Sequence, residues 1–422
     1  MNQPFIHPTH PPFSESVAHI HRILTDTAQG HAPSAKQLQQ LIDWEIANWP
    51  DTHWQYLQDD ESQLEYLPTA LLPYVAKVVE SRAHLMRSLC LSTQGQTLPL
   101  AGNWTDWIDP LWRFWLPFAQ QIDNKYKAQQ ANQSTNHKAH QATHKTTHKM
   151  AHKTAHKTTF IQGILGGQGT GKTTLTHVLQ LILKQLQHET VALSIDDLYL
   201  TYAERQQLRQ EDPRLIWRGP PGTHDVNLGL TTLAQLKTSS IEDKVSVPQF
   251  DKSLIGGQGD RTQPKICLAP TIVLFEGWLV SMRPLADEYF TDDRVQLPSP
   301  IDTPADRAFA RDSNRRLQKY LPLWQFLDSL LVLQPQDHRL SLQWRQQAEH
   351  TMKANGKPGL SDPEIADFVS YFWKALHPKL FIPPLIHSSG HRPTYGSATP
   401  LVANINTDHT IERVYSAQLG AL

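Results

Sequence analysis

The chain has few cysteines, no excess of one charge and no long apolar run, and each absence excludes a class of protein. Two cysteines among 422 residues, Cys90 and Cys267, form neither a metal-site spacing nor a disulfide framework, so we expect a reducing, intracellular setting. The net charge of -1 gives no indication of nucleic acid or an anionic membrane as a partner. No apolar stretch approaches the ~20 residues of a membrane span, and the first residues lack the pattern of a secretory signal. We therefore expect a cytoplasmic protein.

One long segment lacks acidic residues altogether. Residues 129–158 contain almost no apolar side chain, and histidines recur every four positions, at His140, His144, His148, His152 and His156. Such a composition does not bury enough apolar surface to offset the entropy of ordering, so we interpret 129–158 as a flexible basic linker. A metal-chelating tract is the alternative. It is disfavoured because no carboxylate or thiolate would help fix a coordination geometry.

The segments on either side of this linker differ in pattern. Residues 1–128 carry apolar side chains at helical spacing, for example Leu38, Leu41 and Ile42, and we expect a small helical accessory domain there. Residues 159–422 alternate strand-like and helix-like stretches, which is typical of a parallel sheet with helices on both faces. The expected strands are 160–165, 190–195, 271–275, 326–333 and 400–405. The expected helices are 172–186, 304–321, 338–353 and 362–376. Two of them have a start signal, in which a hydroxyl residue stands three positions before an acid: Thr303 before Asp306, and Ser361 before Glu364.

The stretch 166–173, GGQGTGKT, matches the phosphate-binding pattern G-x-x-x-x-G-K-[ST] at every position. An apolar strand precedes it and a helix-forming run follows, which is the context that a P-loop requires. Backbone N–H groups and the helix N-terminus would hold the phosphates, Lys172 would reach the β- and γ-phosphates, and the Thr173 hydroxyl would bind Mg²⁺. The residues expected to bind ATP are Gly166, Gly167, Gln168, Gly169, Thr170, Gly171, Lys172, Thr173 and Thr174.

Three acids follow two of the expected strands. Asp196 and Asp197 follow the strand at 190–195, and Glu276 follows the strand at 271–275. Ligands of open α/β sheets bind outside the carboxyl ends of the strands, so these acids should approach the phosphates. One of them could act as a base toward an acceptor hydroxyl while another helps to hold Mg²⁺. A turn or a helix cap is the default interpretation of an isolated Asp-Asp pair, but here a P-loop precedes it.

The motifs SIDDLYLTYAERQQL, RGPPGTHD, VPQFDKSLIGGQGDR and FEGW, in this order after the P-loop, resemble the plant-type D-glycerate 3-kinases. That family belongs to the P-loop small-molecule kinases, with phosphoribulokinase, uridine kinase and pantothenate kinase. The resemblance covers about residues 160–422 and implies phosphorylation of D-glycerate by ATP to give 3-phosphoglycerate, as in photorespiratory salvage. It also implies that Asp196 is the general base, that Asp197 and Glu276 join Thr173 at Mg²⁺, and that Arg345 lies on a lid helix over the transferring phosphoryl group.

A second GGQG lies in the stretch 253–261, SLIGGQGDR, without the GK[ST] of a P-loop. Its place in the resemblance implies an acceptor loop. A carboxylate is well held by an arginine fork or by an ammonium with backbone N–H groups, so Lys252 and Arg261 are candidates for the acceptor carboxylate. His224 and Asp225 are candidates for its hydroxyls. A surface turn with solvated charges is the alternative.

Two other functions remain open from the sequence. One is a kinase for another small alcohol, such as uridine, pantothenate or a sugar phosphate. Only the acceptor motifs favour glycerate over these substrates. The other is a nucleotide-gated regulatory protein in which residues 1–128 bind a partner. Asp196 and Asp197 and the expected lid argue against a regulator, because a switch needs no acceptor base.

Overall fold

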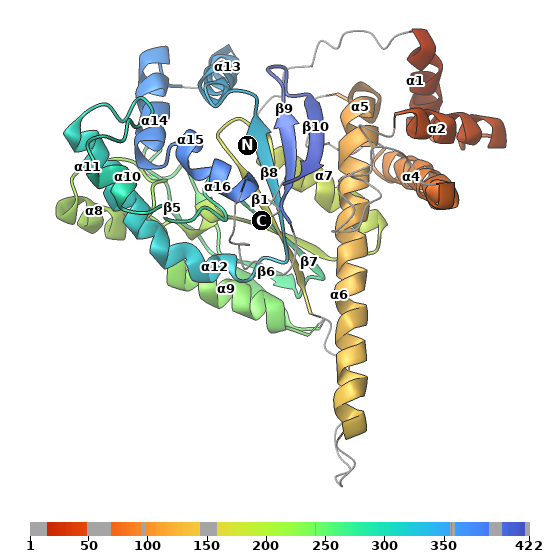
Figure 1. Ribbon diagram of the computed structural model, residues 1–422, viewed down its shortest axis with the longest axis horizontal. Coiled ribbons are helices and arrows are strands. Elements are labelled where there is room, and N and C mark those ends of the chain that lie inside the picture. The colour runs from red at the N-terminus through yellow and green to blue at the C-terminus, as the bar shows by residue number, and fades with distance from the viewer. Residues whose placement is uncertain are drawn as a thin grey trace.

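The computed structural model describes residues 15–48, 69–143, 158–387 and 399–417, except residues 95, 97, 99, 101, 241, 355, 357 and 358. Within these residues the chain forms a six-stranded sheet with helices on both faces, and two further two-stranded ribbons (Figure 1). The α/β fold expected from the sequence is confirmed.

The strands are β1 (Phe160–Gly166), β2 (Thr190–Ser194), β3 (Lys244–Val247), β4 (Phe250–Asp251), β5 (Asp260–Arg261), β6 (Lys265–Leu268), β7 (Ile272–Gly277), β8 (Ser329–Pro335), β9 (Leu401–Ile405) and β10 (Ile411–Ser416). The helices before the P-loop are α1 (Glu15–Ala28), α2 (Ala35–Ala47), α4 (Leu72–Ser92), α5 (Ile108–Pro110) and α6 (Leu116–Thr143). Those after it are α7 (Lys172–Gln185), α8 (Tyr202–Glu211), α9 (Val226–Thr238), α10 (Glu288–Thr291), α11 (Pro304–Arg316), α12 (Leu321–Trp324), α13 (Leu340–Ala354), α14 (Asp362–Ala375), α15 (Pro378–Phe381) and α16 (Pro383–Ile386).

The six strands lie in the order β10-β9-β8-β1-β7-β2. Five of them are parallel, as expected, and β10 pairs antiparallel with β9 at the edge. The sequence analysis did not predict β10. Its side chains are mostly exposed or half-buried, so it lacks the apolar run that marks the central strands.

Alternate side chains of the strands point to opposite faces of the sheet and enter two separate cores. In β1, Phe160 and Ile164 join one buried cluster, whereas Ile161 and Leu165 join the other. Helices α4, α6 and α7 cover the first face, and α9, α11 and α12 cover the second. The doubly covered sheet leaves its strand ends as the place where polar groups gather.

The N-terminal helices pack on the sheet rather than on a core of their own. Met86 and Leu89 of α4, both 0% exposed, belong to the same cluster as Val178 of α7 and Leu274 of β7. In Figure 1, α6 runs alongside the sheet, and α1, α2 and α4 lie near its upper part. The expected boundary at residue 128 falls inside α6. Residues on both sides of this boundary contribute to one buried core, and the division into an accessory domain and a kinase domain stays a prediction.

Helix α6 also differs from the expected linker at 129–158. It continues to Thr143, and its side chains Gln129 and Gln130 donate to Asp328 Oδ1 at 3.1 Å and to the Thr158 carbonyl at 2.7 Å. Alanine, glutamine and lysine are strong helix formers, and the helix is continuous with a buried preceding turn, so propensity outweighs the polar composition there. Residues 144–157, with His144, His148, His152 and His156, lie outside the described residues.

The expected helices of the second half are confirmed with small changes of bounds. Thr303 and Ser361 form the capping boxes at the starts of α11 and α14 that the sequence predicted. The single helix expected over 304–321 is instead α11, a 3-10 turn over Leu317–Tyr320 and the short α12. Pro322 begins this last piece, where its missing N–H costs no helical bond.

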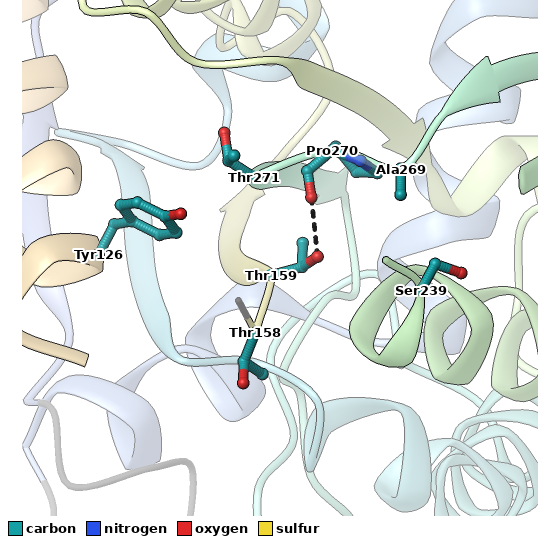
Figure 2. A pocket seen from close by; sticks show the side chains of 7 residues that line it. All are labelled: Tyr126, Thr158, Thr159, Ser239, Ala269, Pro270 and Thr271. Atoms are coloured by element: carbon teal, nitrogen blue, oxygen red, sulfur yellow. Dashed lines mark hydrogen bonds between the residues drawn. The ribbon is translucent and has the colours of Figure 1, made fainter. Parts of the chain in front are cut away.

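A small pocket lies at the N-terminal ends of β1 and β7, between α6 and the end of α9 (Figure 2). It encloses about 10 Å³, and the Thr159 hydroxyl beside it donates to the Pro270 carbonyl at 2.8 Å. The P-loop follows the opposite end of β1, so this pocket is remote from the phosphate-binding residues. Its size is that of a single water molecule, not of a substrate.

Candidate active site

The P-loop connects β1 directly to α7. Gly169 and Gly171 take the left-handed conformation, with φ of 76° and 81°, that lets the chain fold back on itself. The Lys172 ammonium and the Thr170 hydroxyl both donate to the Gly167 carbonyl, at 2.8 and 2.9 Å. Burial lowers the pKa of Lys172, and the charge of Glu276 acts in the opposite direction. The strand–loop–helix context expected for GGQGTGKT is confirmed.

The acids expected at the strand ends lie next to this loop. In the sheet register, Glu276 of β7 is paired with Ile164 of β1 and with Ser194, the last residue of β2. The Thr173 hydroxyl donates to Glu276 Oε1 at 3.3 Å. Burial raises the pKa of Glu276, against the charge of Lys172. A hydroxyl and a carboxylate, both oxygen ligands, therefore meet at the start of α7.

Asp196 lies between a cation and a hydroxyl. Its Oδ2 accepts from Lys252 Nζ at 2.6 Å, and its Oδ1 accepts from the Tyr199 hydroxyl at 2.8 Å. Burial would raise the pKa of Asp196, but the Lys252 ammonium and the two hydrogen bonds outweigh it and hold the pKa well below its usual range. Asp196 is therefore ionised at any physiological pH.

Asp197 has a different environment although it is the next residue. Its Oδ2 accepts from the Ser194 N–H at 3.0 Å, which completes the capping box of the 3-10 turn Ile195–Leu198, and its Oδ1 accepts from the Phe250 N–H at 3.3 Å. Burial raises the pKa of Asp197 to about 6, with the backbone hydrogen bonds opposing it. Both carboxylate oxygens of Asp197 thus accept hydrogen bonds from backbone N–H groups, and the bond from Phe250 positions β4.

His224 packs beside Asp196 through Tyr199. The segment around His224 forms an isolated antiparallel bridge to Tyr199, and the two rings stack at a centroid distance of 4.7 Å. His224 is 5% exposed, and burial lowers its pKa to about 4, so the imidazole is neutral.

Hydrogen-bond counting fixes the tautomer of His224. The Gly222 N–H donates to the Tyr320 hydroxyl oxygen at 2.9 Å, and that hydroxyl lies 2.8 Å from His224 Nδ1. All three groups are satisfied when Tyr320 donates its proton to Nδ1, which leaves the ring proton on Nε2. Nε2 is buried and has no partner within the described residues. His224 therefore offers a hydrogen-bond donor, not a base.

Asp225 and Arg261, two of the predicted acceptor residues, bind each other. Arg261 Nη2 donates to Asp225 Oδ2 at 3.2 Å and to the Tyr199 carbonyl at 3.0 Å. Asp225 also caps α9, since its Oδ1 accepts from the Leu228 N–H at 2.9 Å. This pair joins β5 to the start of α9 beside the acceptor loop.

We call residues 252–259 the acceptor loop. Gly256, Gly257 and Gly259 have positive φ there, as P-loop glycines do. The loop, however, presents carbonyl groups to two arginines. Arg205 Nη2 donates to the Gln258 and Gly259 carbonyls at 2.8 and 2.6 Å, and Arg218 Nη1 donates to the Gly257 and Gln258 carbonyls at 2.9 and 2.8 Å. The second GGQG is thus not arranged as a second P-loop.

Helix α13, which carries the predicted lid residue Arg345, lies against the P-loop. A Cβ built on Gly169 would meet Trp344 Cβ at 2.6 Å, and one on Gly167 would meet Ser341 Oγ at 3.1 Å. Trp344 is held in turn by its indole N–H, which donates to the Thr407 carbonyl at 2.9 Å. Arg345 itself pairs with Glu349 at 2.9 Å.

Known proteins resemble this chain over half of its length or more. No protein-family model matches the chain. The chain is 36% identical over 224 residues to the uncharacterized kinase mug58 of Schizosaccharomyces pombe, covering 50% of this chain and 78% of that protein. It is 34% identical over 237 residues to the chloroplastic D-glycerate 3-kinase of Arabidopsis thaliana, covering 53% of this chain and 48% of that enzyme. The chain thus spans about half the length of the Arabidopsis enzyme. The solved structure of D-glycerate 3-kinase from Cryptococcus neoformans superposes with a TM-score of 0.56 at 26% identity, over 71% of this chain and 99% of that one.

The chain belongs to the D-glycerate 3-kinase family of P-loop kinases. As a kinase of this family it is a phosphotransferase whose phosphoryl donor is ATP. Within the described residues, no helix combines the length and the apolar character that a membrane crossing requires.

In this kinase the structure brings the predicted residues into one region, but they do not all contact one another. Lys172, Thr173, Asp196, Lys252 and Glu276 are joined by hydrogen bonds or direct charge interactions. Arg345 is near the P-loop through its helix, but its charge is paired with Glu349.

Sequence reasoning about this kinase missed four residues at the site, Tyr199, Arg205, Arg218 and Tyr320. Tyr199, Arg205 and Arg218 lie inside the motifs that carried the resemblance, SIDDLYLTYAERQQL and RGPPGTHD, so attention to every polar residue of those motifs could have found them. Tyr320 follows α11, far along the chain from His224, and nothing in its sequence context marks it.

Proposed function

We propose that this kinase transfers the γ-phosphoryl group of ATP to D-glycerate and releases 3-phosphoglycerate. The observation that carries the proposal is the position of Asp196, an ionised carboxylate with the P-loop lysine on one side and an acceptor loop on the other. Lys172 and Lys252 are both among the charges that act on this cluster. Relatives named D-glycerate 3-kinase support the choice of acceptor.

On the donor side, the backbone N–H groups of 166–174 and the Lys172 ammonium would hold the phosphates and stabilise charge in the transition state. Mg²⁺ fits the oxygen donors present, Thr173 Oγ1 and the Glu276 carboxylate. Asp197 is a third candidate for the metal, although its two oxygens accept backbone N–H groups. When bound at these oxygens, the metal would supply positive charge that offsets the negative charge of the phosphates. Arg345 would add a positive charge from α13.

On the acceptor side, Asp196 would orient the attacking hydroxyl and accept its proton. The low pKa of Asp196 keeps it ionised, and displacement of Lys252 from the pair would make it a stronger base. His224 would donate from Nε2 to an acceptor oxygen. Lys252, Asp225 and Arg261 would border the same space. Phosphoryl transfer needs little covalent help from the protein, so this positioning is the larger part of catalysis.

A cytoplasmic location and a place in photorespiratory salvage belong to the proposal as well. Both cysteines, Cys90 and Cys267, are unbridged, which suits a reducing compartment. Fractionation of cells and growth on a glycolate source after loss of the gene would test the two statements separately.

The proposal is tested with purified protein, Mg-ATP and four acceptors, D-glycerate, uridine, pantothenate and ribulose 5-phosphate. We expect turnover with D-glycerate, and phosphorus NMR of the product should identify the 3-phosphate. Lys172→Ala should lose on the order of 10²-fold or more in turnover, and Asp196→Asn should keep ATP binding while losing turnover. Preference for another acceptor would refute the glycerate assignment, and ATP binding with no turnover of any acceptor would favour a nucleotide-gated regulator.

A further inference from the structure

An acceptor with a carboxylate needs a cation whose charge is not already committed. Lys252 Nζ is bonded to Asp196, the proposed base, at 2.6 Å. Arg261 Nη2 is bonded to the Asp225 carboxylate and to a carbonyl, and its Nε is buried without a partner among the described residues. The two cations that the sequence suggested for the carboxylate are therefore both paired with carboxylates of the protein.

Arg218 faces the same space and is only partly engaged. Its Nη1 donates to the two acceptor-loop carbonyls of Gly257 and Gln258, while its Nη2 and Nε have no partner among the residues that the structure describes. The guanidinium lies over the rings of Tyr199 and Phe250, with centroid distances of 6.0 and 5.7 Å. The side chain is partly exposed.

The neighbours of Arg218 place it at the acceptor side of Asp196. Tyr199, under the guanidinium, donates its hydroxyl proton to Asp196, and Phe250 is held by Asp197. Arg218 is also one of the charges that act on Lys252, whose pKa is raised chiefly by Asp196. The guanidinium therefore lies beside Tyr199 and Phe250, both of which contact the neighbouring aspartates, and close enough to Lys252 for their charges to interact.

We propose that Arg218 recognises the carboxylate of the acceptor through its free Nη2 and Nε edge, and so makes this kinase select a hydroxy acid over a neutral polyol. This inference rests on the proposed function, since it names the group by which the acceptor is chosen. An arginine fork matches two carboxylate oxygens, and the aromatic faces beneath it fix its plane.

The same residue would couple acceptor binding to the acceptor loop. Arg218 holds two loop carbonyls with one nitrogen, and the loop carries Lys252, the partner of Asp196. A carboxylate bound on the opposite edge fixes the guanidinium and, through it, the loop. Binding of the correct acid thereby steadies the lysine that neutralises the base.

Arg205 provides a matched control for Arg218. It donates to carbonyls of the same loop and lies over the same Phe250 ring at 5.2 Å, but it is 9% exposed, and its Nη1 is occupied by the Leu200 carbonyl. Arg205 thus supports the loop without an edge open to the acceptor. Its loss should weaken all acceptors alike.

The experiment compares D-glycerate with its amide, in which a neutral carboxamide replaces the carboxylate, for the unaltered kinase, Arg218→Ala, Arg218→Lys and Arg205→Ala. Removal of a hydrogen bond to a charged group should lower kcat/KM for D-glycerate roughly ten- to a hundredfold in Arg218→Ala. The value for the amide should fall only as far as it does in Arg205→Ala, because both arginines support the acceptor loop, and the KM for ATP should hold. Arg218→Lys should recover part of the preference for the acid, and Arg205→Ala should lower both values equally.

Other outcomes separate the two proposals. The inference is overturned if the unaltered kinase prefers D-glycerate and Arg218→Ala keeps that preference. It is also overturned if Arg218→Ala lowers kcat/KM for the acid and the amide equally, as Arg205→Ala does. In both cases Arg218 only supports the loop. If the unaltered kinase uses D-glycerate and its amide equally well, the carboxylate is not recognised and the inference is overturned, while the glycerate assignment stands. No turnover of D-glycerate would refute the glycerate assignment itself. Thermal unfolding of each variant guards against loss of fold, and Arg218→Lys retains the charge if Arg218→Ala does not fold.

Discussion

Neighbouring aspartates at residues 196 and 197 carry opposite pKa shifts because their surroundings differ. Burial acts on both, but only Asp196 has an ammonium as its partner. Asp197 accepts backbone N–H groups, whose partial charges compensate burial less completely than a full charge does. One acid is thereby kept ionised, and the other holds β4 in place.

The raised pKa of Asp197 predicts an acidic limb in the pH profile. As the pH falls through about 6, Asp197 gains a proton, one oxygen ceases to accept from Ser194 or Phe250, and kcat/KM for the acceptor should fall. Stability depends on pH in the opposite direction. A carboxyl whose folded-state pKa is raised contributes to stability below its unfolded pKa, and this contribution is lost as the pH rises toward 6.

Profiles of kcat/KM between pH 5 and 8 for the unaltered kinase and Asp197→Asn test this prediction. Asparagine does not titrate, so the limb near pH 6 should be absent from the profile of the variant. Its plateau value of kcat/KM should be lower, because one backbone N–H group loses its acceptor. ATP titrates equally in both samples and cancels from the comparison. An identical limb in both profiles would show that another group is responsible.

At the scale of elements, the two GGQG turns share the conformation of their last glycine but have different neighbours. The last glycine of each, Gly169 and Gly259, has a positive φ, of 76° and 70°, beneath an aromatic side chain. Over Gly169 it is Trp344 of α13, and over Gly259 it is Phe250 of β4. The identical tetrapeptide therefore packs against α13 in one case and against β4 in the other.

Alanine at each of these glycines should separate the two substrates. A Cβ would lie 2.6 Å from Trp344 Cβ at Gly169 and 2.5 Å from Phe250 Cε1 at Gly259, so the neighbouring element must move. We expect Gly169→Ala to raise the KM for ATP at least about tenfold, and Gly259→Ala to act mainly on the KM for the acceptor.

Gly256→Ala is the control for backbone strain, because φ is 59° there and no atom lies within 4 Å of the added Cβ. It should cost only about 1 kcal/mol of conformational strain and leave the KM for ATP unchanged. Steady-state kinetics with each substrate varied in turn give the result. Equal effects of Gly169→Ala and Gly259→Ala on one KM would contradict the assignment of separate roles.

At the scale of the whole molecule, the N-terminal helices pack on the sheet through a shared buried apolar cluster, and polar contacts reinforce it. Asp123 of α6 accepts from His188 Nε2 at 3.0 Å and from Lys127 at 2.7 Å, and His188 Nδ1 lies 3.1 Å from the Thr271 hydroxyl that precedes β7. Removal of the helices would expose the apolar face of α7.

A core substitution in an N-terminal helix should therefore destabilise the entire protein. Leu89→Ala removes a side chain that is 0% exposed, which typically costs 2–5 kcal/mol, and calorimetry should show a single transition shifted to lower temperature. Leu91→Ala on the same helix, where the side chain is 40% exposed, should have little effect. A separate low-temperature transition in Leu89→Ala would mean that the helices unfold independently.

The features that the sequence determined by itself are local ones. The P-loop, the strand before it, α7 and the capping boxes at Thr303 and Ser361 depend on residues within a few positions of each other. Short-range hydrogen bonds and side-chain periodicity decide these elements in any context, so they could be predicted. The approach of the acids to the P-loop followed from the rule that parallel strands end at one edge.

Only the tertiary structure decided how the polar groups are paired. Asp196 and Lys252 are 56 positions apart, Arg218 and Gly257 are 39 apart, and His224 and Tyr320 are 96 apart. The contacts of Gln129 with Asp328 and of Gln130 with Thr158 likewise join residues that are distant in the sequence. Burial, and contacts with residues that are distant in the sequence but close in space, set the protonation state, the tautomer and the hydrogen-bonding groups that stay free. A linear pattern of residue types contains neither the burial nor these contacts.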